Sequence, residues 1–421
     1  MMNAFALVDC NNFYASTERV FNPKVQRRPI VVLSNNDGCV IARSEEAKQI
    51  GVTMGAPLFK VQDLLDDAGA EVFSSNYELY GDMSARVMEN LREFTPRVEV
   101  YSIDEAFLEL DARRGDLGEI GFSIRDKIKK WTGIPISVGI AETKTLAKLA
   151  NRLAKKSEKT EGVLDIYRSP HLDAALQKTA VRDVWGIGSA SAEKLDDRGI
   201  RTALELREAD LRWVRKRLTV VGARTVLELR GVSCLPLELT PPPKKTITCS
   251  RSFGQTIEKL SELREAIAFF LARAAEKLRR HQLAANSVTV FIGTDRFHPQ
   301  PLAYENSAVH KSIYLSDTDY ELRKWAFACL ISIYRQGFAY RRAGLILSGL
   351  TPVEGMTCRM FDQKNWERFR SVMAAVDEIN RKFGRDTVRF AVARPDGIWR
   401  GRSERRSDRY TTRFGEIAKA R

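Results

Sequence analysis

The 421-residue sequence is poor in the side chains that bind zinc or form disulfide frameworks. It contains only four histidines, and its six cysteines are scattered from Cys10 to Cys358 without a C-x-x-C pair. This composition argues against a structural zinc site and against a disulfide-stapled fold. Unpaired cysteines fit a reducing compartment, so we expect a cytoplasmic protein.

Long apolar runs are also absent. The first apolar run, Ala4–Val8, is ended by Asp9 and is too short for a signal peptide or a membrane-spanning helix, so we expect no membrane partner. The sequence has no internal repeat and no G-x-x-x-x-G-K-[ST] motif, which excludes a P-loop ATPase. An apolar content of 44% excludes wholesale disorder, and the length predicts two to four domains.

Positive charge is present in excess, but only in the last part of the chain. The formal net charge is +14, and residues 1–241 contribute none of it. Residues 242–350 and 351–421 contribute +7 each. A basic third beside a neutral body suggests a polyanion such as nucleic acid as partner, whereas the simpler alternative is a solubilising surface.

The first 165 residues alternate between strand and helix patterns, which predicts a layered α+β domain. Two of the strand-like runs are separated by only four residues, Ser102–Glu105, which is hairpin spacing. The expected strands are 4–8, 30–33, 98–101, 106–110 and 134–140, and the expected helices are 40–50, 83–94, 122–131 and 143–156.

The rest of the chain divides at a triple proline, residues 241–243, where we place a domain boundary. Residues 171–231 lack strand patterns and are predicted to be helical. Residues 246–350 have the order β-α-β-β-α-β, which is ferredoxin-like. Beyond Pro352 we expect one helix over 366–382 and a loosely structured stretch over 394–421.

Three carboxylates could meet at one edge of the first domain. Asp9 ends a buried strand, and Asp104 and Glu105 lie in the predicted hairpin turn. Clustered carboxylates repel one another unless a cation neutralises them, and oxygen-only ligands favour Mg²⁺. Two such ions would support phosphoryl transfer. The alternative is that all three are ordinary solvated residues at strand ends.

Other candidate residues also keep a simpler alternative. Phe13 and Tyr14 could pack on a sugar or base, or could belong to the core. Lys144 and Lys148 share one helical face and could meet a triphosphate, or could be solvated. Gly186 and Gly188 form an apolar-Gly-apolar-Gly turn before a helix, which could bind a DNA phosphate as in a helix-hairpin-helix, or could be a plain turn.

Several strings together resemble the Y-family of DNA polymerases, specifically its bacterial UmuC type. The resemblance runs from Phe5 to about Leu350, with a weaker trace, RYTTR, over residues 409–413. The strings that carry it are ALVDCNNFYAS (6–16), VLSNNDGCVIAR (32–43), SSNYELY (74–80), YSIDEAF (101–107), TKTLAKLA (143–150) and CSRSFG (249–254).

The resemblance implies a right-hand polymerase that copies damaged templates with low fidelity in the SOS response. The implied domains are a palm (1–20 and 79–165), fingers (21–78), a helical thumb with a helix-hairpin-helix (166–241), a ferredoxin-like little finger (242–350) and a basic, partner-binding C-terminal tail (351–421). The tail would tether partners and DNA without taking part in chemistry.

The resemblance also assigns roles to single residues. Asp9, Asp104 and Glu105, with the backbone carbonyl of Cys10, would bind two Mg²⁺ ions. Tyr14 would be the steric gate that excludes a ribose 2′-OH, and Phe13 would lie beside the nucleotide. The triphosphate would be contacted by Lys48 and Lys148, and the DNA by Gly186, Gly188, Lys244, Lys245 and Arg251.

The implied partners are primer-template DNA, dNTPs, a processed UmuD-type dimer, the RecA filament and a sliding clamp. Two positions depart from the family pattern. Glu45 stands where other branches have a Tyr that touches the triphosphate. The clamp-binding candidate, Thr357–Phe361 with Met360 and Phe361 as its apolar end, lacks the usual leading Gln. A DNA-binding scaffold and a two-metal nuclease remain rival functions.

Overall fold

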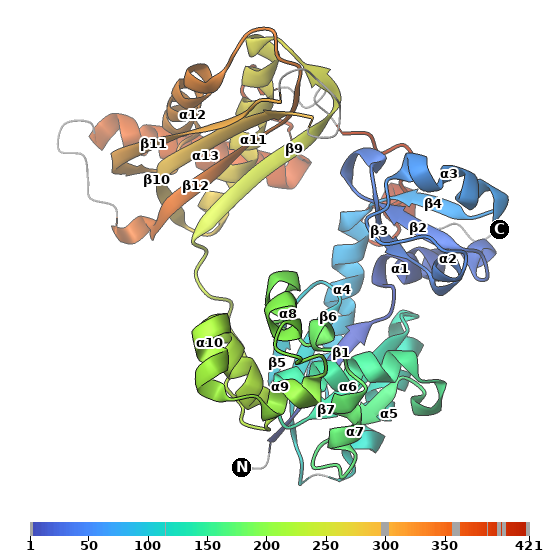
Figure 1. Cartoon of the computed structure of the whole chain (residues 1–421). Helices are drawn as coiled ribbons and strands as arrows, with labels where there is room; N and C mark the ends of the chain where they lie inside the picture. The colour runs from blue at the N-terminus through green and yellow to red at the C-terminus, as the bar shows by residue number, and fades with distance from the viewer. Residues whose placement is uncertain are drawn as a thin grey trace. The chain divides into compact units, whose positions relative to one another are not determined.

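A computed structural model describes residues 3–113, 115–295, 303–355, 363–384, 386–393, 397 and 401–417. The chain forms two compact units (Figure 1). The first comprises Met1–Ser34, Cys39–Pro242 and Arg405–Arg421, and the second comprises Asn35–Gly38 and Pro243–Glu404. The boundary between Pro242 and Pro243 therefore lies inside the triple proline, where the sequence predicts it. No helix among the described residues is long and apolar enough to cross a membrane.

A five-stranded sheet with the order β5-β6-β1-β7-β8 is the centre of the first unit. Its middle strand, β1, pairs antiparallel with both β6 and β7, so β1 is apolar on both faces along most of its length. The predicted hairpin is present, because β5 and β6 pair antiparallel. The strands are β1 (Asn3–Cys10), β5 (Val98–Val100), β6 (Glu105–Asp111), β7 (Ile136–Ala141) and β8 (Val163–Asp165).

Helices cover both faces of this sheet. Helices α4 (Tyr77–Arg92) and α5 (Leu117–Thr132) pack with the even-numbered residues of β1, and α6 (Lys144–Lys156) packs with the odd-numbered ones. Gly139 of β7 permits a close approach of α6, since a Cβ there would lie 2.1 Å from the backbone nitrogen of Asn151. Asp9 is odd-numbered, so it belongs to the α6 face.

A three-stranded sheet with the order β3-β2-β4 forms a smaller layer of the first unit. The predicted helix over residues 40–50 is wrong in its first half, because residues 40–43 form a strand and Ser44 caps a helix that starts at Glu45. The elements are α1 (Phe13–Phe21), β2 (Ile30–Leu33), β3 (Val40–Arg43), α2 (Glu45–Gln49), α3 (Leu58–Asp67) and β4 (Glu71–Ser74), with a short 3₁₀ turn at Pro23–Val25. The 3₁₀ turn Asn35–Asp37, between β2 and β3, belongs to the second unit.

Residues 171–231 are mainly helical, as predicted. Their buried side chains continue the core on the α6 face of the five-stranded sheet. The helices are α7 (Leu172–Gln177), α8 (Ser189–Asp196), α9 (Ala203–Glu208) and α10 (Leu211–Leu229), with 3₁₀ turns at Glu158–Thr160 and Val181–Asp183.

The second unit has the predicted β-α-β-β-α-β order. Its four strands are all antiparallel to their neighbours and lie in the order β11-β10-β12-β9, so β12 separates β9 from β10. Both helices pack on the sheet through one continuous core (Figure 1). The elements are β9 (Thr246–Ile257), α11 (Leu260–Arg280), β10 (Leu283–Thr294), β11 (Glu305–Ser316), α12 (Asp319–Ile333) and β12 (Tyr340–Pro352).

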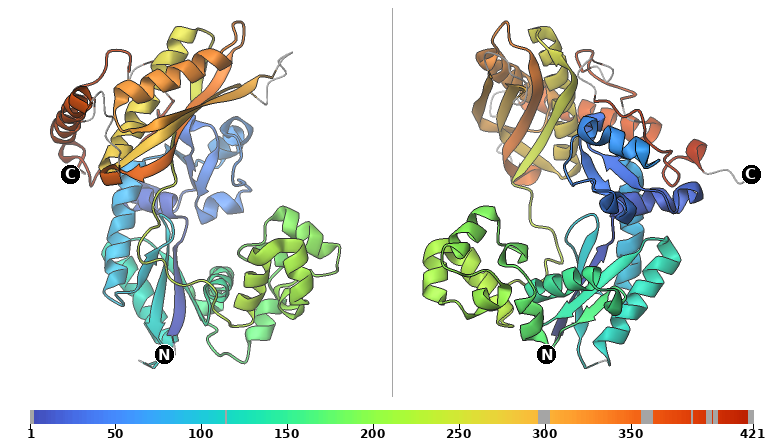
Figure 2. Two further views of the ribbon diagram at one scale, coloured as in Figure 1. Left: turned by 90° about the vertical axis from the view of Figure 1, so that its left-hand side faces the viewer. Right: turned by 45° about the vertical axis from the view of Figure 1, so that its right-hand side comes forward.

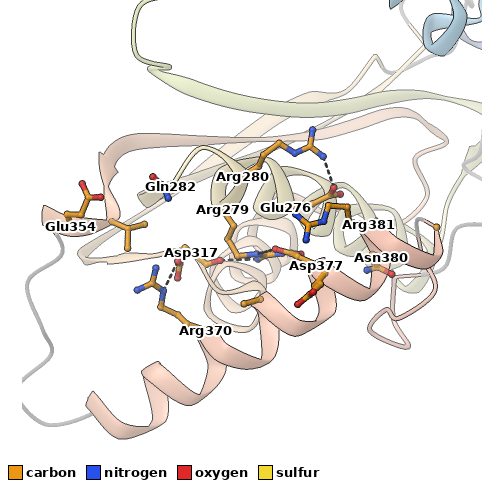
Figure 3. Close-up of a pocket in the computed structure, with 14 residues that line it drawn as sticks. Glu276, Arg279, Arg280, Gln282, Asp317, Glu354, Arg370, Asp377, Asn380 and Arg381 are labelled. Atoms are coloured by element: carbon orange, nitrogen blue, oxygen red, sulfur yellow. Dashed lines mark hydrogen bonds and ion pairs between the residues drawn. The ribbon is translucent and has the colours of Figure 1, made fainter. Parts of the chain in front are cut away.

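The helix predicted beyond Pro352 exists and is longer, α13 (Gln363–Phe383), after a 3₁₀ turn at Val353–Gly355. It is not a free tail, because Asp377 of α13 accepts two hydrogen bonds from the largely buried Arg279 of α11, and Arg370 pairs with Asp317 (Figure 3). A charged cavity of about 870 Å³ lies between these helices. The predicted clamp residues Met360 and Phe361 lie outside the described residues.

The last described residues form no long element, as predicted, but they are not loose. Residues 405–417, with a 3₁₀ turn at Phe414–Glu416, belong to the first unit (Figure 2). Tyr410 stacks on Phe21 of α1 with ring centroids 5.0 Å apart. Arg409 is only 9% exposed and is held by Glu416 and Glu78. The expectation of one separate tail over residues 351–421 is therefore wrong.

Candidate active site

Two of the three predicted carboxylates lie directly opposite each other on the central sheet. Asp9, near the end of β1, pairs in register with Glu105, the first residue of β6. Directly opposed residues of an antiparallel pair project from the same face of the sheet, which here is the face covered by α6. Both residues line a small cavity of about 200 Å³ with side chains of α6 and with Trp185.

Two lysines of α6 neutralise these carboxylates. The Lys155 Nζ lies 2.5 Å from Asp9 Oδ1, and the Lys148 Nζ lies 2.8 Å from Glu105 Oε2. Burial nevertheless raises the pKa of Asp9 to about 6, since desolvation outweighs the attraction of Lys155 and Glu105 adds repulsion. Desolvation is therefore the main cause of the raised pKa of Asp9, and the repulsion from Glu105 is a smaller one.

The third carboxylate, Asp104, is oriented by the hairpin turn that carries it. The Ser102 hydroxyl donates to Asp104 Oδ1 at 2.5 Å, and its oxygen accepts from the backbone N–H groups of Asp104 and Glu105. The Asp104 carbonyl in turn accepts from the backbone N–H of Cys10 at 2.8 Å. The turn therefore ties Asp104 to the end of β1, next to Asp9.

The backbone around Cys10 is fixed on both sides, because the next residue, Asn11, donates from its N–H to the Pro135 carbonyl at 2.8 Å. The Cys10 side chain faces the opposite core, and burial raises the pKa of its thiol. The thiol is therefore kept protonated and away from the carboxylates, which leaves only the backbone of Cys10 for any role in the site.

The donor set fits a hard divalent cation. The groups that converge at the end of β1 are carboxylate oxygens, without imidazole or thiolate ligands, and this chemistry suits Mg²⁺. In the described part of the chain, no three acidic, histidine or cysteine side chains already surround one point closely enough to hold an ion. Lys148 and Lys155 would have to release the carboxylates for such an ion to bind.

Tyr14, on the first turn of α1, is half-buried and lies in a group of aromatic rings. It stacks on Tyr80 of α4, with ring centroids 4.3 Å apart and planes at 16°, and it meets Tyr77 edge-on at 6.0 Å. Phe13 is different, since it is only 3% exposed and belongs to the core beneath the sheet. This burial agrees with the core alternative for the Phe13 side chain, and the role of Phe13 in nucleotide binding stays a prediction.

Tyr80 is held by a buried carboxylate that sequence reasoning missed. Its hydroxyl donates to Glu18 Oε1 at 2.6 Å, and Glu18 is 1% exposed. The Ser407 hydroxyl donates to the same oxygen at 3.0 Å. Burial raises the pKa of Glu18 to about 7, although both hydrogen bonds lower it.

This raised pKa predicts a pH dependence of stability. A carboxyl that ionises near pH 4.5 when unfolded and near pH 7 when folded destabilises the fold progressively as the pH rises through that window, by up to ~3 kcal/mol. We expect Glu18→Gln to reduce the loss of melting temperature between pH 5 and pH 8. Thermal melts of the parent, of Glu18→Gln and of the exposed control Glu193→Gln across this pH range measure the effect. Equal slopes of melting temperature against pH in all three proteins would contradict the prediction.

Lys144 does not lie where a triphosphate could meet it. It is 3% exposed, pairs with the buried Glu99 and donates to the Pro236 carbonyl at 2.8 Å. Glu99 also accepts from the N–H of Glu238 at 2.8 Å. This buried pair joins α6, β5 and the segment after α10, so the triphosphate alternative for Lys144 is wrong.

Because Glu99 would be left as an unpaired buried charge, Lys144→Ala is expected to cost ~3–5 kcal/mol of stability. In a unit of this size that corresponds to a fall in melting temperature of about 10 °C. The exposed pair Lys127–Glu93 offers the control Lys127→Ala, for which we expect almost no change. Equal effects of the two substitutions in calorimetry would exclude a structural role for the Lys144 pair.

The remaining predicted nucleotide contact, Lys48, lies on α2 and pairs with Glu45 at 2.7 Å. Glu45, the residue that differs from the family pattern, therefore neutralises Lys48, three residues further along the chain.

Comparison with known proteins agrees with this geometry. The family models described as impB/mucB/samB family and its C-terminal domain match residues 8–152 and 244–358. Protein UmuC of Salmonella typhimurium is 43% identical over 99% of this chain and 100% of its own length. The chain belongs to the impB/mucB/samB family of Y-family DNA polymerases. It is a DNA-directed DNA polymerase with an α+β fold.

Another relative of this polymerase and a solved structure of a similar protein agree with this assignment. DNA polymerase IV of Alkalilimnicola ehrlichii is 31% identical over 67% of this chain and 79% of the relative. A Y-family polymerase chimera of Dbh and Dpo4 has a TM-score of 0.67 at 22% identity, covering 83% of this chain and 99% of that one. A third family model, a domain of unknown function, matches residues 370–420.

The Gly-x-Gly turn of the polymerase begins the helix α8. Gly186 has φ +91°, which favours glycine, and a Cβ there would lie 3.1 Å from the Thr225 hydroxyl. A Cβ at Gly188, the N-cap of α8, would meet no protein atom within 4 Å. Packing therefore does not require glycine at 188, whereas a close approach of an external group to the backbone would.

The predicted DNA contacts of the second unit are all exposed. Lys244 and Lys245 immediately precede β9, and Arg251 lies on β9, an edge strand of its sheet. Lys155, by contrast, was missed. It lies seven residues after Lys148 on α6, a spacing that returns to the same helical face and could have indicated both partners of the carboxylates.

Proposed function

We propose that this polymerase is an error-prone translesion enzyme that extends primers past damaged bases in the SOS response. The observation that carries the proposal is the juxtaposition of Asp9 and Glu105 on one face of the sheet, with the Asp104 turn tied to the same strand end. The name UmuC of the 43%-identical relative supports the SOS assignment.

In the proposed mechanism Asp9, Asp104 and Glu105, with the Cys10 carbonyl, would hold two Mg²⁺ ions. Such ions stabilise the attacking and leaving oxygens of a nucleotidyl transfer. Lys148, released from Glu105, would pair with the triphosphate, and Lys48 would add a second contact. The two lysines would thereby place the α-phosphate near the carboxylates, where negative charge develops during transfer.

Tyr14 would act as the steric gate. Its ring would lie under the sugar of the incoming nucleotide, where a 2′-OH would collide with it, so that deoxyribose is accepted and ribose is excluded. The stack on Tyr80 supports this role, because it restrains the ring from turning aside.

We propose the following domain roles. The five-stranded sheet with α4, α5 and α6 would be the palm, and the small three-stranded sheet the fingers. Helices α7–α10 would be the thumb, with Gly186 and Gly188 binding a DNA phosphate. Residues 242–350 would be the little finger, which grips DNA through Lys244, Lys245 and Arg251.

We further propose a processed UmuD-type dimer and the RecA filament as partners, and the sliding clamp through Met360 and Phe361. The enzyme would act in the cytoplasm, on the nucleoid. The basic C-terminal segment would contribute to these contacts in addition to the packing of residues 405–417 on the first unit.

The proposal is tested with the purified full chain, a labelled primer-template, dNTPs and Mg²⁺. We expect extension on undamaged DNA and past an abasic site or a thymine dimer in the template, with frequent misincorporation. Primer degradation instead of extension would indicate a nuclease, and binding without any reaction a scaffold. Extension that always stops one base before both lesions would contradict the translesion assignment.

A further inference from the structure

Two strings of the sequence, 74–80 and 409–413, contain no residue that is proposed to bind metal, nucleotide or DNA, and the structure brings them together. The Ser74 N–H donates to the Arg405 carbonyl at 3.0 Å, and the Arg405 N–H donates to the Ser74 hydroxyl at 3.0 Å. Further along, Arg409 pairs with Glu78 at 3.2 Å. The C-terminal segment thus runs along the start of α4, which carries Tyr77 and Tyr80.

Asn76 is the centre of this contact. Its side-chain amide donates to the Ser407 carbonyl at 3.0 Å, to the Ser407 hydroxyl at 3.0 Å and to the Asp408 carbonyl at 3.2 Å. Its side-chain oxygen accepts from the N–H of Leu79 and so caps α4. One residue therefore fixes both the helix start and the position of Ser407.

Ser407 is linked through Glu18 to Tyr80, the residue on whose ring Tyr14 stacks. The Ser407 hydroxyl donates to Glu18 Oε1, the same oxygen that accepts from the Tyr80 hydroxyl. Tyr80 is fully buried and lies parallel to Tyr14 at 4.3 Å. A continuous path of contacts therefore runs from Ser407 through Glu18 and Tyr80 to Tyr14.

We propose that Ser407, Glu18 and Tyr80 are positioning residues for the steric gate, through which the C-terminal segment of this chain sets discrimination against ribonucleotides. The inference rests on the proposed role of Tyr14. It gives part of the domain of unknown function, residues 370–420, a place behind the nucleotide site.

The physical reason is the burial of Glu18. A carboxyl group that is 1% exposed depends on protein donors, and the raised pKa of about 7 shows that its charge is only partly compensated. Without the Ser407 hydroxyl, one of two donors to Oε1 is lost. The Glu18 side chain and the Tyr80 hydroxyl are then free to rearrange, and the Tyr14 ring loses the fixed surface against which it stacks.

The test measures the ratio of kcat/KM for dNTPs to that for rNTPs in single-nucleotide addition by the full chain. Ser407→Ala, Glu18→Gln and Tyr80→Phe each remove one link while leaving the aromatic rings in place. The matched control is Ser403→Ala, the same substitution at an exposed residue of the same segment. Ser407→Thr restores the hydroxyl, and Tyr14→Ala tests the gate itself.

A small displacement of a catalytically positioned group changes rates by up to ~100-fold, and a displacement transmitted through other residues changes them less. We therefore expect Ser407→Ala to lower the ratio of kcat/KM for dNTPs to that for rNTPs roughly threefold to tenfold. Ser407→Thr should restore it, and Ser403→Ala should leave it unchanged. If Tyr14→Ala lowers the ratio but none of the three linked variants does, the segment is merely structural and the inference is wrong. If Tyr14→Ala itself has no effect, the gate assignment fails and the inference fails with it.

Discussion

Asp104→Asn is expected to abolish nucleotide addition while primer-template binding persists. The substitution keeps an oxygen that can accept from the Ser102 hydroxyl, so the hairpin turn should survive. It removes the negative charge that would help to hold the metal ions. Losing several kcal/mol of transition-state stabilisation lowers kcat by ~1000-fold or more.

The measurement is single-turnover incorporation of one dNTP, beside a DNA-binding titration of the same preparation. Asp111→Asn, at the far end of β6, the strand that follows the Asp104 turn, is the matched control and should retain the activity of the parent. Substantial extension by Asp104→Asn would show that the proposed metal site is elsewhere. Loss of DNA binding together with activity would instead indicate that the turn has collapsed.

The carboxylate site could be predicted from sequence because it depends on local patterns. A buried strand that ends in Asp9 and a hairpin whose turn contains Asp104 and Glu105 can meet only if the two strands are neighbours, and β1 and β6 are. The spacing of Lys148 and Lys155 could indicate that they share one helical face, but not that this face meets the carboxylates. Lys148 and Lys155 reach the site only because Gly139 lets α6 approach the sheet closely.

Other features depend on contacts between distant segments, which local patterns do not contain. The error in the helix predicted over residues 40–50 is an exception, because the cap Ser44, which sets the helix start at Glu45, is a local signal that was overlooked. Phe13 and Lys144 have the residue types of a binding site, yet tertiary packing buries both. In the second unit, local patterns predicted the order of elements but not that β12 lies between β9 and β10.

The C-terminal segment shows the same limit most clearly. Weak periodicity and a high positive charge suggested a tail without a role in the catalytic body. Its fixed position comes instead from single polar contacts, such as Ser407 with Asn76, and from Tyr410 stacked on Phe21. Such contacts need no apolar repeat, so no periodicity could have indicated them.

Tyr14→Ala is expected to admit ribonucleotides. If the Tyr14 ring fills the space beside C2′, a 2′-OH collides with it, and overfilling a packed site costs ~1–3 kcal/mol, or about 10- to 100-fold in relative rate. Removing the ring opens this space without touching the carboxylates, so incorporation of dNTPs should fall far less than discrimination does.

Tyr14→Phe separates the ring from its hydroxyl. Phenylalanine keeps the stack on Tyr80 and the blocking surface, so we expect it to exclude ribonucleotides as the parent does, although the hydroxyl is lost. Single-nucleotide incorporation with each dNTP and its matching rNTP provides the comparison. If alanine and phenylalanine discriminate equally well, another side chain blocks the 2′-OH. If both lose discrimination, the tyrosine hydroxyl is needed and exclusion does not depend on the ring alone.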